Sequence, residues 1–235
     1  MRERKFTILS TSVLNEEQIP EMPDSVDIQI IPFIEIVPVP LEIIKTRITQ
    51  LASEKQNIIF TSAHAVKSVT RILLNKTDWN IYCVGKVTRH AIESWFGRIA
   101  IADSARNAKD LSDLIISSHL SRAVFFSGDQ RLNILPENLK KANIPLEEIV
   151  VYETRLTPRH LTECPDAGLF FSPTAVNSFF SVNTISADVI LFAMGDTTAS
   201  MIRQYVPNPV IISAEADKTF VLNMALEYAG KHPIL

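Results

Sequence analysis

The chain of 235 residues has only six glycines and two cysteines. Glycine is so sparse that neither GxGxxG nor GxxxxGK[ST] occurs, which argues against the common dinucleotide and P-loop nucleotide sites. Cys83 and Cys164 lack CxxC spacing, which excludes a disulfide framework and a thiolate metal site. The five histidines never fall at HxH or HExxH spacing. We therefore expect no metal site.

Long apolar runs and a strong excess of either charge are also missing. No segment approaches the roughly 18 consecutive apolar residues of a membrane span, and the N-terminus lacks the pattern of a signal peptide. We expect a cytoplasmic protein without a membrane partner. The 23 Lys and Arg against 26 Asp and Glu leave a formal net charge of -3, so a nucleic-acid partner is not expected. The length and the 46% hydrophobic content fit two folded domains.

What the chain does contain is an internal repeat with an offset of 110 residues. The first pair aligns IIFTSAHAVKSV with GLFFSPTAVNSF, which places Ser62 over Ser172. The second pair aligns IYCVGKVTRHAI with LFAMGDTTASMI, which places Gly85 over Gly195. A third pair, 101–114 over 211–224, keeps the same offset. An ungapped match of this length indicates two duplicated domains.

Each repeated segment has an apolar strand, a small polar turn and an amphipathic helix. In the second segment we expect Val87, Ala91, Ile92 and Trp95 on the buried helix face. Apolar strands that alternate with helices predict the α/β class, with parallel sheets flanked by helices on both faces. We expect two flavodoxin-like domains of this kind.

The order of the segments predicts that one domain is inserted into the other. Residues 41–150 contain a full set of strands and helices, whereas the second copy stops after its third segment. The missing strands match the layout near the N-terminus, which predicts a discontinuous domain of residues 1–33 plus 157–235. The linkers are then 34–40 and 151–156, a two-stranded β-ladder acting as a hinge beside a cleft.

The polar turns between strands and helices are the candidate binding sites. In doubly wound sheets, ligands bind outside the carboxyl ends of the strands, where helix N-termini offer backbone N–H groups to anions. These turns favour a ligand that carries carboxylates or phosphates. For any single hydroxyl, ordinary helix capping is the better explanation, and the case for a ligand rests on the expectation that the whole set opens onto one cleft. Tyr152 ends an apolar strand near one predicted crossing, where it either packs on the sheet or acts as a hydrogen-bond donor or weak acid.

Taken together, these segments resemble the uroporphyrinogen-III synthase family. The resemblance rests on five segments: FTSAHAV, VGKVTRHAI, the stretch from SGDQRLNILPENLKKANI to VVYET, FFSPTAV and MGDTTASMI. It covers nearly the whole chain. It implies two flavodoxin-like domains, with the N-terminal strand in the C-terminal domain. The implied activity is that of a cyclising hydro-lyase of tetrapyrrole (haem) biosynthesis, which converts hydroxymethylbilane to uroporphyrinogen III with loss of water and inversion of ring D, without a cofactor.

The resemblance also assigns residue roles. Tyr152 matches the family's tyrosine and is the implied group that assists loss of the hydroxyl. Other matching positions are the implied contacts of the substrate, which carries eight carboxylates: Thr61, Ser62, Gly85, Thr88, Gly128, Asp129, Ser172, Gly195, Thr197 and Thr198. Two turns depart from the family pattern, because Lys86 follows the first glycine and Asp196 the second.

Two further expectations and one alternative complete the sequence-based picture. We expect a monomer that takes its substrate in a transient hand-over from hydroxymethylbilane synthase. A non-catalytic two-lobed module that binds an anionic small molecule remains the alternative, because the residues alone do not separate binding from turnover. Hinged solute-binding proteins share such a two-lobed layout but are usually exported, and this sequence shows no export signal.

Overall fold

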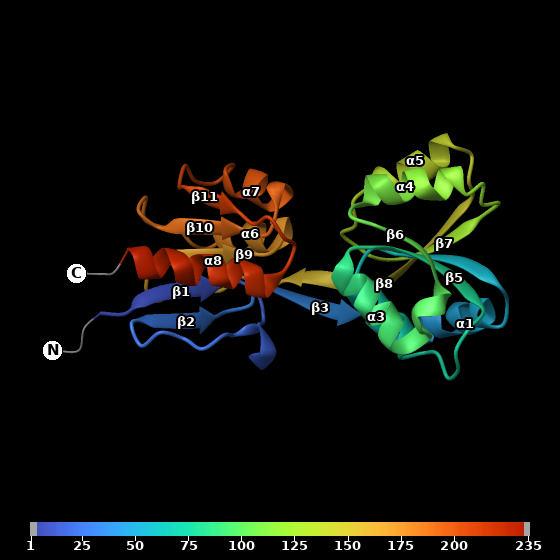
Figure 1. Cartoon of the computed structure of the whole chain (residues 1–235), viewed down its shortest axis with the longest axis horizontal. Coiled ribbons are helices and arrows are strands. Elements are labelled where there is room, and N and C mark those ends of the chain that lie inside the picture. Colours follow the sequence, from blue (N-terminus) through green and yellow to red (C-terminus); the bar gives the residue numbers. More distant parts are fainter. Residues whose placement is uncertain (1–3, 233–235) are drawn as a thin grey trace. The chain divides into compact units, whose positions relative to one another are not determined.

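A computed structural model describes residues 4–232, and its internal contacts divide the chain into two compact units. Unit 1 comprises the residues up to Glu35 and those from Arg155 onward, whereas unit 2 runs from Ile36 to Thr154 (Figure 1). Unit 2 is therefore inserted between the two parts of unit 1. The elements of unit 1 are β1 (Phe6–Ser10), a 3-10 helix (Glu16–Gln18), β2 (Val26–Ile30), β9 (Ala167–Phe170), α6 (Pro173–Phe180), β10 (Ile190–Ala193), α7 (Asp196–Ile202), β11 (Val210–Ile212) and α8 (Lys218–Lys231).

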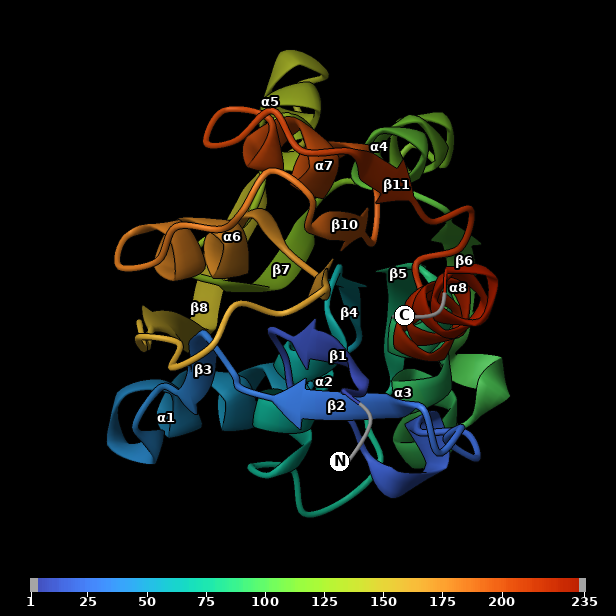
Figure 2. The ribbon, with the colours of Figure 1, turned by 90° about the vertical axis from the view of Figure 1, so that its left-hand side faces the viewer.

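The sheet of unit 1 has five parallel strands in the order β11-β10-β9-β1-β2. When the strands are numbered along the chain and read from the β2 edge, this order is 2-1-3-4-5. Helix α8 packs on one face, where Val221 and Leu222 are buried in the same hydrophobic cluster as Ile8 of β1. Helices α6 and α7 pack on the other face, where Val176 and Leu9 are buried together (Figures 1 and 2). Both faces of the sheet are thus covered, as a parallel sheet requires.

Unit 2 contains a six-stranded sheet in the order β3-β8-β7-β4-β5-β6. Its strands β4 to β8 are parallel. In chain order, these five strands occupy the sheet positions that β9, β10, β11, β1 and β2, respectively, occupy in unit 1. The edge strand β3 lies beside β8, and the N–H of Val39 donates to the carbonyl of Val151 at 3.1 Å. The elements are β3 (Ile34–Pro38), α1 (Leu41–Ala52), β4 (Gln56–Phe60), α2 (Ala63–Thr70), β5 (Trp79–Val84), α3 (Lys86–Phe96), a 3-10 helix (Arg98–Ala100), β6 (Ile101–Ala105), α4 (Ala108–Ser117), β7 (Ala123–Gly128), α5 (Ile134–Lys141) and β8 (Leu146–Leu156).

Alternation along the strands of unit 2 explains how its helices divide between the two faces. Ile58 and Phe60 of β4 pack with α1, α2 and α3, whereas Ile59 packs with α4 and α5. Successive strand residues point to opposite faces, so a strand that is apolar throughout contributes to two cores. The α/β class with helices on both faces of parallel sheets is confirmed. The expected burial of Val87 on α3 is wrong, because this side chain is 58% exposed while the neighbouring Thr88 is buried.

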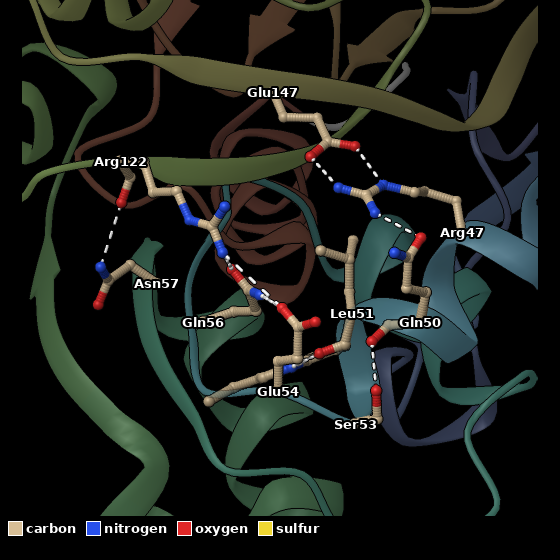
Figure 3. Close-up of polar contacts among 10 residues, drawn as sticks. Arg47, Gln50, Leu51, Ser53, Glu54, Gln56, Asn57, Arg122 and Glu147 are labelled. Atoms are coloured by element: carbon tan, nitrogen blue, oxygen red, sulfur yellow. Dashed lines mark hydrogen bonds and ion pairs between the residues drawn. The ribbon is translucent and has the colours of Figure 1, made fainter.

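A charged network fixes α1 to the amino-terminal end of the unit 2 sheet (Figure 3). The guanidinium of Arg47 donates two hydrogen bonds of 2.6 Å to the carboxylate of Glu147 on β8. Arg122, in the loop before β7, donates to the Gln56 side chain at 3.2 Å and lies 3.9 Å from the carboxylate of Glu54. The hydrogen bonds from Arg47 lower the pKa of Glu147 below its ordinary value of 4.5, and burial partly opposes this effect.

The lowered pKa of Glu147 predicts a small, pH-dependent contribution to stability. A carboxyl group whose folded-state pKa is lowered stabilises the fold above its unfolded pKa, and this contribution disappears as the pH falls through the folded pKa. We expect Glu147→Gln to lower Tm at pH 7 by only a few degrees, because both partners are partly exposed. At pH 3 the difference from wild type shrinks, whereas Glu163→Gln, in an exposed loop, leaves Tm unchanged at both values. An equal loss at both pH values in thermal denaturation would show that packing, not charge, is responsible.

Candidate active site

The side chain of Tyr152 on β8 lies directly over Gly128 at the end of β7. The two residues are paired in the sheet, immediately after a register shift between Ser127 and Gly128. A Cβ atom at position 128 would lie 2.4 Å from Cζ and 2.7 Å from Oη of Tyr152. Real Cβ atoms essentially never approach another atom so closely. Glycine is therefore needed at position 128 for the tyrosine ring to occupy this place.

Three further groups surround the tyrosine within unit 2. The N–H of Asp129 donates to the carbonyl of Tyr152 at 3.1 Å, and the Asp129 carboxylate accepts from the N–H of Thr154 at 2.8 Å. Ser62 precedes α2, and the interaction of its side chain with the phenol lowers the pKa of Tyr152. The ring of His64 lies with its centroid 5.8 Å from the Tyr152 ring. The structure thus brings together four of the predicted residues: Ser62, Gly128, Asp129 and Tyr152.

The environment of Tyr152 keeps its phenol protonated. Burial raises the pKa of Tyr152 above its ordinary value of 10, because the charged phenolate is less well solvated there. The nearby Asp129 carboxylate raises this pKa further, whereas the hydrogen bond with Ser62 lowers it. The net effect is a raised pKa, so the phenol carries its proton at neutral pH. A protonated, half-buried phenol is a hydrogen-bond donor and a weak acid.

The two serines that the repeat aligns have the same local role. Ser62 precedes α2 and accepts a hydrogen bond from the N–H of His64 at 3.1 Å. Ser172 precedes α6 and accepts from the N–H of Ala175 at 3.2 Å. Both are therefore N-caps, which was the alternative explanation of these hydroxyls. A capping hydroxyl accepts through its oxygen and keeps its own hydrogen for another partner.

The two aligned glycines, Gly85 and Gly195, directly precede α3 and α7, and neither has a side chain that could cap its helix. Gly85 has a φ of +81°, a conformation that residues with a Cβ rarely adopt. Thr88 and Thr198 occupy the same third helical position and are only 5% and 3% exposed. Thr197 is exposed. Each glycine thus leaves backbone N–H groups of the first turn without a side-chain cap, which suits an incoming anion.

The predicted residues fall into two groups at the carboxyl ends of parallel strands. Unit 2 contributes the half-buried Thr61 after β4, with Ser62, Gly85, Thr88, Gly128, Asp129 and Tyr152. Unit 1 contributes Ser172 after β9 and the turn after β10, which contains Gly195, Thr197 and Thr198. Within each unit, the carboxyl ends of neighbouring parallel strands share one edge of the sheet, so each group is local.

Two residues near these groups were missed by sequence reasoning. His64 was considered only as a metal ligand, yet its ring lies beside Tyr152. Its position two residues after the capping Ser62 was the available signal. Lys218 begins α8, and its ammonium group lies at the turn after β1. No sequence pattern links these two segments, because they are separated by more than two hundred residues.

Other features of the described residues do not point to a second chemistry. Within 4–232, no group of three His, Cys, Asp or Glu side chains is placed to hold a metal ion. Both cysteines are free, and burial raises the pKa of the Cys83 thiol to about 11. A pocket of about 570 Å³ between α5 and the start of β8 contains none of the predicted residues. Of the helices in the described part of the chain, none has the length and apolar character to cross a membrane.

The family comparison decides which chemistry these residues serve. The family model described as uroporphyrinogen-III synthase HemD matches residues 25–219, which is most of the chain. The chain belongs to the uroporphyrinogen-III synthase family. This membership agrees with the resemblance seen in the sequence, and it makes the chain a cyclising synthase, a lyase of tetrapyrrole biosynthesis. A search of curated proteins found no match.

Solved structures of synthases share the fold. The uroporphyrinogen-III synthetase of Helicobacter pylori is 18% identical with a TM-score of 0.66, and the match covers 96% of this chain and 100% of that one. A mutant uroporphyrinogen III synthase of Thermus thermophilus is 13% identical with a TM-score of 0.64, covering 97% and 100%. The wild-type Thermus enzyme is 15% identical with a TM-score of 0.52, covering 96% and 98%. At these identities the structures support the fold, and the family match supports the function.

Proposed function

We propose that the chain cyclises hydroxymethylbilane with Tyr152 as the group that assists departure of the hydroxyl. The observation that supports this proposal is the half-buried Tyr152 phenol, which lies above Gly128. Its surroundings raise its pKa and so keep it protonated. Such a phenol donates a hydrogen bond or a proton to the leaving oxygen as the C–O bond breaks, and the hydroxyl departs as water. The electron-rich pyrrole supplies the push, so one positioned weak acid is sufficient.

The later steps depend on geometry rather than on further acid groups. Loss of water leaves an azafulvene at ring A, and the substituted carbon of ring D attacks it to give a spiro intermediate. Fragmentation and reclosure through the free α carbon of ring D complete the inversion. That carbon then loses a proton, which balances the one donated to the leaving hydroxyl. The enzyme must hold rings A and D in the inverting geometry, because the unguided chain closes to the uninverted isomer.

We further propose that helix N-termini of both units bind the substrate's carboxylates. First-turn N–H groups and the positive end of the helix dipole favour anions. The glycine starts of α3 and α7 support this proposal, because neither has a side-chain cap. The proposed contacts are Thr61, Ser62, Gly85, Thr88, Gly128, Asp129, Ser172, Gly195, Thr197 and Thr198.

The finer description of the fold is also a proposal. Two flavodoxin-like domains joined by a two-stranded β-ladder would correspond to residues 1–33 plus 157–235 and to 41–150. The 2-1-3-4-5 strand order of unit 1 and the adjacent positions of β3 and β8 support it. We also propose a cytoplasmic monomer that receives its substrate from hydroxymethylbilane synthase, since the linear product of that enzyme closes spontaneously if released.

A coupled assay tests the proposed function directly. Hydroxymethylbilane is supplied to the protein, the products are oxidised, and porphyrin isomers I and III are separated by chromatography. We expect mostly isomer III, whereas a protein-free control gives isomer I. Isomer I alone in the presence of the folded protein would refute the proposal and favour the alternative, a non-catalytic module that binds an anionic small molecule.

A further inference from the structure

The ammonium group of Lys218 is held at the carboxyl-terminal edge of the unit 1 sheet. Its Nζ donates to Oγ of Ser12 and to the carbonyl of Val13, both at 2.7 Å. The same atom lies 5.5 Å from the centre of the Phe171 ring. Ser12 follows the end of β1, and Phe171 follows the end of β9. Three separate segments therefore fix the position of this one cation.

The charge of Lys218 is not neutralised within the described part of the chain. None of the carboxylates in residues 4–232 forms an ion pair with Lys218, and that of the adjacent Asp217 instead accepts from the N–H of Phe220 at 3.0 Å. The half-buried site also lowers the pKa of Lys218, through loss of solvation alone. Two of the three ammonium hydrogens have partners in the protein, which leaves one donor for a ligand. A partly desolvated cation with a remaining donor attracts an anion more strongly than a solvated surface lysine does.

The surroundings of Lys218 place this cation beside the predicted substrate contacts of unit 1. Phe171, under the ammonium group, directly precedes the capping residue Ser172. The turn after β1 is itself rigid, because Thr11 donates through Oγ1 to the carbonyl of Leu169 at 2.7 Å and Ser10 donates to the carbonyl of Ser12 at 2.8 Å. The ammonium group is thus preorganised rather than recruited from a mobile side chain.

We propose that Lys218 binds a carboxylate of the tetrapyrrole substrate. The inference rests on the proposed function and adds a residue to it: a charged contact in unit 1, where all other proposed contacts are hydroxyls or backbone groups. A charge-assisted hydrogen bond of this kind is stronger than a neutral one. Lys218 is then a substrate-binding residue, which affects affinity more than the chemical step.

The competing explanation is that Lys218 only ties α8 to the turn after β1. Two substitutions separate these roles. Lys218→Met keeps the aliphatic stem but removes all donors, whereas Lys218→Gln removes the charge and keeps a donor for the Val13 carbonyl. Lys109→Met is the matched control: Lys109 lies in the first turn of α4 in unit 2, and it is exposed and paired with Asp113 at 3.2 Å.

The test measures kcat and KM for hydroxymethylbilane, Kd for uroporphyrinogen III by anaerobic calorimetry, and Tm. We expect both Lys218 variants to raise KM and Kd roughly tenfold to a hundredfold, as loss of a charge-assisted hydrogen bond implies, with kcat little changed. Lys109→Met leaves all values unchanged. A normal Kd in either Lys218 variant would overturn the inference. If Lys218→Gln binds normally while Lys218→Met has a lowered Tm, Lys218 only ties α8 to the turn after β1.

The two proposals fail in different ways. If wild type makes only isomer I but still binds uroporphyrinogen III with an affinity that depends on Lys218, the synthase mechanism fails and the carboxylate contact stands. If wild type makes isomer III with an affinity independent of Lys218, the contact fails and the synthase mechanism stands. A wild-type protein that does not bind uroporphyrinogen III overturns the contact as well.

Discussion

Tyr152→Phe is expected to lower kcat for formation of isomer III roughly a hundredfold, the lower end of what a general acid contributes. The substitution removes only the phenolic oxygen and keeps the ring that packs over Gly128. KM should change little, because the lost interaction acts on the departing hydroxyl and strengthens in the transition state. Rates of isomer III formation, with porphyrin isomers resolved by chromatography, measure this effect.

The control for this prediction is another tyrosine in the same sheet. Tyr82 on β5 is 6% exposed and packs on the opposite face, with α4 and α5. Tyr82→Phe should leave kcat unchanged. Because the pKa of Tyr152 is raised above 10, its proton remains bound through pH 9, and kcat should show no loss from Tyr152 ionisation between pH 7 and 9. Undiminished isomer III with Tyr152→Phe would remove Tyr152 from the mechanism while keeping the function.

Gly128→Ala is expected to impair the enzyme through the same tyrosine. The new methyl group would lie 2.4 Å from the ring, so the Tyr152 side chain must swing out of its place. We expect a loss of kcat similar to that of Tyr152→Phe, with a destabilisation of about 1–3 kcal/mol from overpacking. Steady-state rates and chemical denaturation measure the two effects separately.

A double variant shows whether Gly128 acts through Tyr152. If it does, Gly128→Ala with Tyr152→Phe should be no slower than the slower single variant, because both changes remove one interaction. Independent, additive losses would instead mean that the proposed contact of Gly128 with the substrate contributes to kcat separately from Tyr152. The control is Gly230→Ala in α8, where the added methyl meets no atom within 4 Å. Its activity should be unchanged, and its stability should rise by roughly 0.5–1 kcal/mol.

The α/β class followed from local features of the sequence. Apolar strands such as 56–60 alternate with amphipathic helices, and this pattern has few packing solutions. The sequence also pointed to strand-to-helix turns, and three of the residues predicted there, Ser62, Gly128 and Asp129, lie together with Tyr152 in the structure. The sequence also identified the family, because its motifs are spread over nearly the whole chain.

Helix-face patterns were less reliable in detail. Val87 was expected to be buried, yet in the structure the buried residue of that turn is Thr88. The buried residues of α3 are Thr88, Ile92 and Phe96, which are spaced four apart on one face of the helix. Val87 directly precedes Thr88 and lies off this face, so apolar character alone did not identify which residue of the first turn is buried.

The sequence by itself determined the class of the fold, the repeat, the family and the turns at which a ligand is expected. Only the tertiary structure decided how Tyr152 is placed, because a register shift between β7 and β8 sets its ring over Gly128. Only the tertiary structure also brought Lys218 to Ser12, from opposite ends of the chain. Local patterns report which face of an element is apolar, whereas these contacts depend on the pairing and packing of segments that are distant in sequence.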